Sequence, residues 1–154
     1  MSSITAFRID IPNANIQRLK QKLLLTDFPD EVEGLEDKWA RGVPLTIIKR
    51  LALYWADEFN WRKAEADLNK LPQFKTQIHA EGFGNYDIHF VHQKSDIEQA
   101  IPLLFLHNWP GGFFEVSKML PRLKGDSHSP AFHVVAPSLV DFGFSSANNK
   151  VCII

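Results

Sequence analysis

The sequence predicts an α/β protein in which a helical N-terminal segment precedes a β-sheet. Up to Leu68, apolar residues recur at helical spacing with charged residues between them. After Pro72 the spacing changes, and apolar and polar residues alternate as they do in half-buried strands. Two short, unbroken apolar runs, 103–106 and 132–136, follow. Each ends in a loop, as the strands of an α/β sheet that are buried on both faces do.

The composition is that of a globular protein. The 154 residues are 45% hydrophobic and 23% charged, and the formal net charge of −1 gives no support for a nucleic-acid partner. The single cysteine, Cys152, excludes an internal disulfide, so nothing argues for an oxidising compartment and we expect a cytoplasmic protein. We recognise neither a signal peptide nor an apolar run near the length of about 20 residues that a membrane helix needs, so we expect no membrane association.

Three stretches of the N-terminal segment are expected to be helical. The first follows an extended stretch, 7–11, and can be capped by the side chain of Asn13. The second begins at Pro44, where the missing N–H does no harm, and the third covers Trp61–Leu68. Three tryptophans are interpreted as core anchors rather than as walls of a ligand pocket: Trp39, Trp55 and Trp61.

The alternating residues after Pro72 predict a β-hairpin. The runs 74–80 and 86–92 are joined by a connection that contains glycine, which is typical of antiparallel strands. His89 and His92 lie in the second run, but side chains three residues apart on a strand point to opposite faces. They cannot hold one ion together, and we expect no metal site.

The loop after the apolar run 103–106 is the candidate functional site. It reads His107-Asn108-Trp109-Pro110-Gly111-Gly112, and a helical apolar pattern follows it over 113–123. Ligands of open α/β sheets bind beyond the carboxyl ends of the strands. Glycines in such a loop let backbone N–H groups turn inward, where they can stabilise a developing negative oxygen.

This loop resembles the His-Gly-Trp-Pro oxyanion loop of α/β-hydrolase-fold epoxide hydrolases, with Asn108 in place of the usual glycine. The asparagine adds a side chain where the family keeps space for the substrate, although Asn adopts φ > 0 more readily than most residues. Four blocks of the N-terminal half resemble the microsomal-type members of this family, and their soluble relatives in particular: Gly42–Leu45, Tyr54–Trp55, Phe59–Asn69 and Pro72–Ile78.

The resemblance implies the domain organisation. Residues 1–112 would form an epoxide hydrolase N-terminal-type region, with a helical arm, 1–72, and the first strands and oxyanion loop, 73–112. Residues 113–154 would begin the α/β-hydrolase core, whose sheet would be incomplete. In the loop after the apolar run 132–136, Val140-Asp141-Phe142 stands where the family has Pro-Gly-Tyr. Because Pro-Gly presets a turn, its loss predicts a looser or re-aimed loop.

The resemblance also implies an activity. The family hydrolyses small-molecule epoxides to vicinal diols in epoxide metabolism and detoxification, without a metal or an organic cofactor. An Asp on a Gly-x-Asp-x-Gly elbow attacks the epoxide, and water activated by a histidine hydrolyses the ester. The 154 residues contain no such elbow and no Gly-x-Ser-x-Gly elbow. The resemblance therefore carries over only the residues of the oxyanion loop: His107, Asn108, Trp109 and Pro110.

We therefore expect a truncated family member that is inactive by itself. One alternative is a non-catalytic fragment that associates with another copy or another hydrolase chain through an exposed sheet edge. A second alternative is an esterase or dehalogenase that uses other side chains of this chain. Its candidate residues are Ser138, Asp141, Ser145 and His107.

Overall fold

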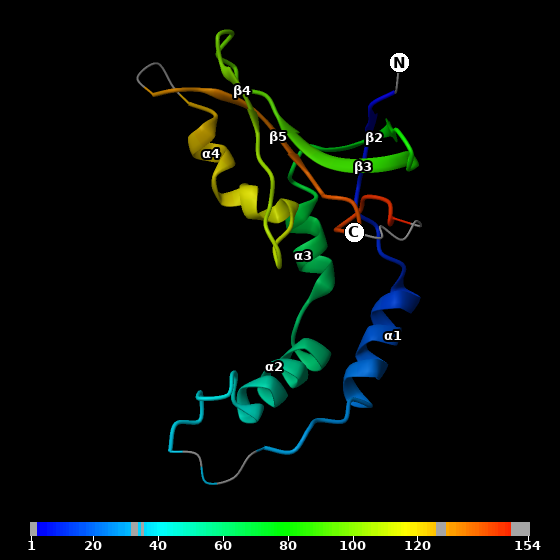
Figure 1. Ribbon diagram of the computed structural model, residues 1–154, viewed down its shortest axis with the longest axis vertical. Coiled ribbons are helices and arrows are strands. Elements are labelled where there is room, and N and C mark those ends of the chain that lie inside the picture. Colours follow the sequence, from blue (N-terminus) through cyan, green and yellow to red (C-terminus); the bar gives the residue numbers. More distant parts are fainter. Residues whose placement is uncertain (1–2, 32–33, 35, 126–128, 149–154) are drawn as a thin grey trace. The chain divides into compact units, whose positions relative to one another are not determined.

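The computed structural model describes residues 3–31, 34, 36–125 and 129–148 (Figure 1). The chain divides into two compact units. One unit is Asp10–Glu65, and the other combines Met1–Ile9 with Ala66–Ile154. Helix α3 (Trp61–Leu68) contributes residues to both. No helix within the described ranges is long and apolar enough to cross a membrane.

The unit Asp10–Glu65 is helical, as predicted. Helices α1 (Asn13–Leu24) and α2 (Leu45–Asp57) pack against each other. Each is preceded by a proline, Pro12 or Pro44, which suits a helix start because its missing N–H would have no partner inside the helix. Asn13 is the first helical residue and makes no capping bond, so its predicted role as cap is wrong.

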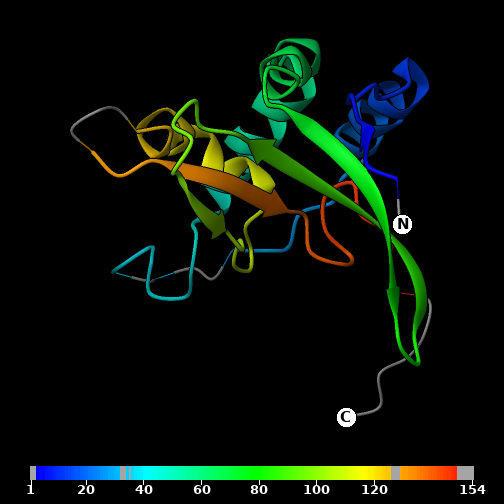
Figure 2. The same cartoon turned by 90° about the horizontal axis from the view of Figure 1, so that it is seen from above.

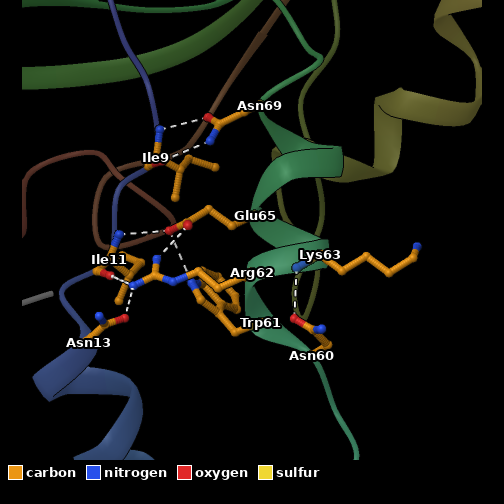
Figure 3. A network of polar contacts seen from close by, with 9 residues as sticks. All are labelled: Ile9, Ile11, Asn13, Asn60, Trp61, Arg62, Lys63, Glu65 and Asn69. Atoms are coloured by element: carbon orange, nitrogen blue, oxygen red, sulfur yellow. Dashed lines mark hydrogen bonds and ion pairs between the residues drawn. The ribbon is translucent and has the colours of Figure 1, made fainter.

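A polar network fixes the start of α1 to the first turn of α3 (Figure 3). One carboxylate oxygen of Glu65, Oε1, accepts the backbone N–H of Ile11 at 2.8 Å and the indole N–H of Trp61 at 3.1 Å. Its other oxygen, Oε2, pairs with Arg62 at 2.6 Å. Arg62 also donates to the backbone oxygen of Ile11 and to the side chain of Asn13, which explains where that asparagine is used.

Two of the three tryptophans predicted as core anchors are exposed. Trp39 is 60% exposed in the turn segment before α2, where its backbone N–H donates to the carboxylate of Asp37. Trp55 is 48% exposed at the rim of an apolar groove that is also lined by Ile16 and Leu19. The interpretation as core residues is wrong for these two, because helical spacing indicates which side of a helix is apolar but not how completely that side is covered.

The second unit is built on a mixed sheet in the order β1-β2-β3-β5-β4. Strands β1 (Thr5–Ala6), β2 (Gln73–Ala80), β3 (Gly84–Gln93) and β5 (Phe132–Pro137) pair antiparallel in that order. Strand β4 (Ile101–Leu104) pairs with β5 in parallel. The β2–β3 hairpin is the long twisted ribbon of Figure 2 and confirms the prediction from alternation. Strand β1 lies before the extended stretch predicted at 7–11, and the pairing with β2 continues into that stretch only through the N–H of Phe7, which donates to the backbone oxygen of Gln73 at 2.9 Å.

The connection from β4 to β5 packs on one face of the sheet. It contains the 3₁₀ helix η1 (Phe113–Lys118) and the short helix α4 (Leu120–Leu123), drawn in yellow in Figure 2. The single helix predicted over 113–123 is therefore interrupted. Pro121 explains the interruption, because it has no N–H for the preceding turn and its ring crowds the carbonyl four residues earlier.

Strand β4 differs from its prediction. The sequence predicts a strand buried on both faces at 103–106, and the parallel pairing does extend to Phe105, whose N–H donates to Val135 at 2.9 Å. However, Leu104 and Leu106 are 62% and 56% exposed. The reason is position, since β4 is the last strand of the sheet within the described residues. Its neighbour β5 lies inside the sheet, and Val134 and Ala136 are fully buried there.

Candidate functional site

Two loops meet at the carboxyl ends of the parallel strands β4 and β5. The loop that is predicted to bind an oxyanion (residues 107–112, called the oxyanion loop below) follows β4, and the second loop (residues 138–146) follows β5. Parallel neighbours end at the same edge of a sheet, which brings their loops together. The backbone N–H of Leu139 donates to Nε2 of His107 at 3.1 Å, and the rings of His107 and Phe142 meet edge to face at 5.1 Å.

His107 joins the two loops. Its side chain is 4% exposed, and Nε2 must be an acceptor because its partner, the Leu139 N–H, can only donate. Nδ1 then carries the hydrogen and points to the backbone oxygen of Asn108 at 3.2 Å. Both ring nitrogens are engaged, so the side chain of His107 links the two loops.

The side chain of Asn108 binds the backbone N–H of Trp109, the donor that the predicted oxyanion role would use. The N–H of Trp109 donates to the side-chain Oδ1 of Asn108 at 2.8 Å. The backbone oxygen of Asn108 separately accepts the N–H of Gly111 at 2.6 Å, which closes the tight turn around the cis Trp109–Pro110 peptide bond. Asn108 does not adopt the positive φ that asparagine tolerates. Among the described non-glycine residues, Asp141 is the one with a positive φ. The side chain that replaces the family's glycine therefore does occupy space in this loop, where it accepts the backbone N–H of Trp109.

Glu115 holds the end of the oxyanion loop. Its Oε1 accepts the N–H of Gly112 at 2.8 Å, at the start of η1. A Cβ on Gly111 would lie 1.5 Å from that oxygen and 2.7 Å from the backbone oxygen of Asn108. Glycine is therefore required at position 111 because the carboxylate and the turn fill the space that a side chain would need.

The second loop contains an ordered turn despite the loss of Pro-Gly. The N–H of Phe142 donates to the backbone oxygen of Leu139 at 2.9 Å, which closes a four-residue turn. Asp141 takes the third position with φ 71°, a conformation that glycine adopts at little cost. Its carboxylate accepts the N–H of Asn148 at 2.7 Å. The prediction of a looser loop is wrong at this turn, because Asp141 adopts the glycine-like conformation and its side chain ties down the loop.

The residues considered for an esterase or dehalogenase do not form one site. Ser138 is 1% exposed and bonds to His89, not to His107. Ser145 uses its Oγ to donate to the backbone oxygen of Ser138 at 2.7 Å and to accept the N–H of His89 at 3.0 Å. Asp141 and His107 are engaged as described above. Each side chain holds the second loop in place, and no nucleophile–base pair is exposed among them.

The buried position of His89 was not predicted from the sequence. Its Nδ1 lies 2.8 Å from Oγ of Ser138 and its Nε2 lies 3.0 Å from Oε1 of Gln73. The ring is fully buried, and Phe113 meets it edge to face at 4.7 Å. Burial, with a smaller effect of the Lys75 charge, lowers the pKa of His89 from 6.5 to about 4. The apolar neighbours Ile88, Phe90 and Val91 were the signal that both faces of this strand are covered.

Metal ligands do not gather in the described part of the chain. Within the ranges that the structure covers, there is no group of three or more His, Cys, Asp or Glu side chains that could hold an ion. His89 and His92 lie on β3, and each contacts different aromatic rings.

The fold and the paired loops are those of the α/β-hydrolase fold, as the comparison with solved structures shows. The solved structure of an enantioselective mutant of the epoxide hydrolase from Aspergillus niger matches 94% of this chain and 38% of its own, with a TM-score of 0.81 and 33% sequence identity. A putative epoxide hydrolase of Stigmatella aurantiaca (strain DW4/3-1) is 42% identical over 147 residues, and juvenile hormone epoxide hydrolase 1 of Ctenocephalides felis is 35% identical over 153 residues.

The family model described as "Epoxide hydrolase N terminus" matches residues 4–116, and the chain belongs to this family. The alignments cover 92% and 96% of this chain but only 32% of each of the two relatives. The chain thus spans about a third of the length of the curated relatives that it matches. The recognised loop with Asn108 and Trp109 lies inside the matched region.

Proposed function

We propose that these residues supply the oxyanion-binding part of an enzyme that hydrolyses a small-molecule epoxide to a vicinal diol through an Asp ester. The observation that carries the proposal is the placement of the Trp109 N–H in a tight loop beyond the carboxyl end of β4, next to the second loop. In this role the N–H of Trp109 holds the negative oxygen of the tetrahedral intermediate that forms when water attacks the ester. His107 and Pro110 shape the loop.

A chimera tests this role. Residues 4–116 of this chain would replace the matching part of the Aspergillus niger enzyme, and turnover of styrene oxide would be measured. Trp109→Pro removes the N–H, and we expect it to lower kcat about 100-fold, the usual effect of losing one oxyanion donor. Trp109→Phe keeps the N–H and is the matched control. Equal kcat in the two variants, both folded by circular dichroism, would contradict the role of this amide.

We also propose that the 154 residues are inactive by themselves. The reaction needs an Asp nucleophile on an elbow, and the sequence contains no Gly-x-Asp-x-Gly motif. The purified chain incubated with styrene oxide should form no diol above the rate in buffer. Diol formation above that background, abolished by heat denaturation of the protein, would refute the inactivity.

A second candidate function is association through the edge of the sheet. Strand β4 is terminal in the described sheet, and its exposed side chains include Ile101 and Leu104. Exposed apolar edge strands favour pairing with another chain. Sedimentation should therefore find dimers or larger species, and Leu104→Lys should shift them to monomer. A stable wild-type monomer at high protein concentration would rule this function out.

The remaining expectations concern organisation and location. The division into a helical arm, 1–72, a region of first strands and oxyanion loop, 73–112, and the start of the core, 113–154, stays a proposal. A cytoplasmic location also stays a proposal, supported by the single cysteine. Expression of a fluorescent fusion in the source cells would test it, and fluorescence confined to an organelle or the medium would contradict it.

A further inference from the structure

The contact between Asn108 and Trp109 has a direct chemical meaning. In the proposed function, the N–H of Trp109 is the donor for a negatively charged oxygen. In the structure the same N–H already donates to a neutral carboxamide oxygen, Oδ1 of Asn108, at 2.8 Å. Where the family usually has glycine, this chain therefore has a side chain that puts an oxygen in front of the donor.

We propose that the Asn108 carboxamide is a displaceable internal occupant of the oxyanion position, and that it competes with a charged oxygen for the Trp109 N–H. This inference rests on the proposed function, because that function assigns the N–H its role. Asn108 is a positioning residue in this account. It acts through the Trp109 amide and forms no bond to the reacting atoms.

The strengths of the competing hydrogen bonds determine when the side chain leaves. A hydrogen bond to an ionised oxygen is roughly twice as strong as one between neutral groups. A neutral oxygen of a bound epoxide or ester would replace Oδ1 with little gain, whereas a charged intermediate would gain the difference. The bond to Asn108 must break for either occupant, so Asn108 lowers the affinity of the Trp109 N–H for both by the same factor, and only an oxygen that gains more than this cost displaces the side chain.

The loop allows the side chain to move without unfolding. Asn108 is exposed, so rotation about its χ1 takes the carboxamide into solvent. The loop backbone is held by other contacts: the backbone oxygen of Asn108 accepts from Gly111, His107 bonds to Leu139, and Glu115 binds Gly112. Removing the side chain therefore removes the occupant and leaves the loop fixed.

Acetate is a suitable probe because it presents a small, negatively charged oxygen that can accept a hydrogen bond from the Trp109 N–H. The ¹⁵N-labelled 154-residue chain would be titrated with sodium acetate at constant ionic strength, with sodium chloride as the balancing salt. The Trp109 amide resonance would be followed in the wild type, in Asn108→Ala and in Asn85→Ala. The last is the matched control, because Asn85 is an exposed asparagine on β3 whose side chain bonds to His79.

We expect Asn108→Ala to bind acetate about fivefold more tightly than the wild type, which corresponds to about 1 kcal/mol, the net value of one hydrogen bond. Asn85→Ala should bind like the wild type. Equal affinity of the wild type and Asn108→Ala would overturn the internal occupant while leaving the oxyanion role of Trp109 intact. A Trp109 resonance that shows no saturable shift in any of the proteins would overturn both.

A second measurement needs no variant and covers the case in which Asn108→Ala fails to fold. In the wild type, acetate that displaces Oδ1 must change the environment of the Asn108 side-chain NH₂ group. Its two resonances should therefore shift with the same midpoint as the Trp109 amide. A Trp109 shift without any change at the Asn108 side chain would overturn the proposal.

Discussion

The buried His89 should make the stability of this chain depend on pH. Its Nε2–H donates to Oε1 of Gln73, whose own NH₂ group donates to the backbone oxygen of Leu68. Nδ1 therefore accepts the hydroxyl hydrogen of Ser138. Every bond of this chain is made with a neutral ring, and a second proton on the ring would place a charge in a fully buried position.

The sign follows from the pKa of His89, which is 6.5 in a model compound and about 4 in the folded protein. Between pH 6.5 and pH 4, His89 is protonated in the unfolded chain but neutral in the folded chain. The free energy of unfolding therefore falls as the pH falls towards 4. The full difference corresponds to about 3 kcal/mol, and about 2 kcal/mol of it is lost between pH 7.5 and pH 5. Burial also lowers the pKa of His92, which acts in the same direction.

Urea unfolding at pH 7.5 and pH 5 measures this difference. His89→Gln removes the titrating ring and keeps a polar side chain, so it should lose about 2 kcal/mol less than the wild type over this range. The contribution of His92 is common to both proteins and cancels. His79→Gln removes an exposed histidine of the same hairpin and is the matched control for replacing a histidine by glutamine. The same loss of stability in His89→Gln and the wild type would refute the reasoning.

Three further substitutions test the loops and the helical unit. Gly111→Ala should lower stability by about 1–3 kcal/mol in urea because its Cβ displaces Glu115, and a loss below that of Gly112→Ala would contradict this. Glu65→Gln should lower the melting temperature at pH 7 and lower it less as the pH falls, because hydrogen bonds from the Ile11 N–H and from Arg62 lower the pKa of Glu65 and stabilise its ionised form; an effect that is the same at every pH would count against it. Asp141→Asn keeps the acceptor for the Asn148 N–H and tolerates the positive φ, so the free energy of unfolding should change by less than about 0.5 kcal/mol. Asp141→Val removes the acceptor and places a β-branched residue at positive φ, so it should lower the free energy of unfolding by more than about 1 kcal/mol.

The sequence predicted those parts of the fold that depend on local pattern. Alternation identified the β2–β3 hairpin, and helical spacing identified α1, α2 and α3. Burial was predicted less well, because it depends on which elements lie next to a strand or helix. The apolar run containing Leu104 is typical of a strand buried on both faces, yet β4 lies at the end of the described sheet. No local pattern contains that information.

The candidate site shows the same division. The residues of the oxyanion loop could be named from the sequence, since the resemblance to the family is carried by consecutive positions. The bond from Leu139 to His107 and the burial of His89 could not be predicted, because they join residues that are 32 positions apart in one case and 49 in the other. Such contacts depend on the order of strands in the sheet. The order places β5 between β3 and β4 and so brings His89 and His107 to opposite sides of one loop.

Asn108 and Asp141 suggest a common consequence of losing glycine in these loops. Both stand where the resemblance places glycine, and each side chain accepts a backbone N–H of its own loop or its flank, that of Trp109 or that of Asn148. The effect of the replacement differs because the two amides differ in use. The Asn148 N–H only closes the second loop, so the contact stabilises the fold. The Trp109 N–H is the proposed donor to substrate, so the contact must break before the donor can act. The same kind of contact, a side-chain oxygen that accepts a backbone N–H, thus stabilises the second loop and competes with the proposed oxyanion at the first.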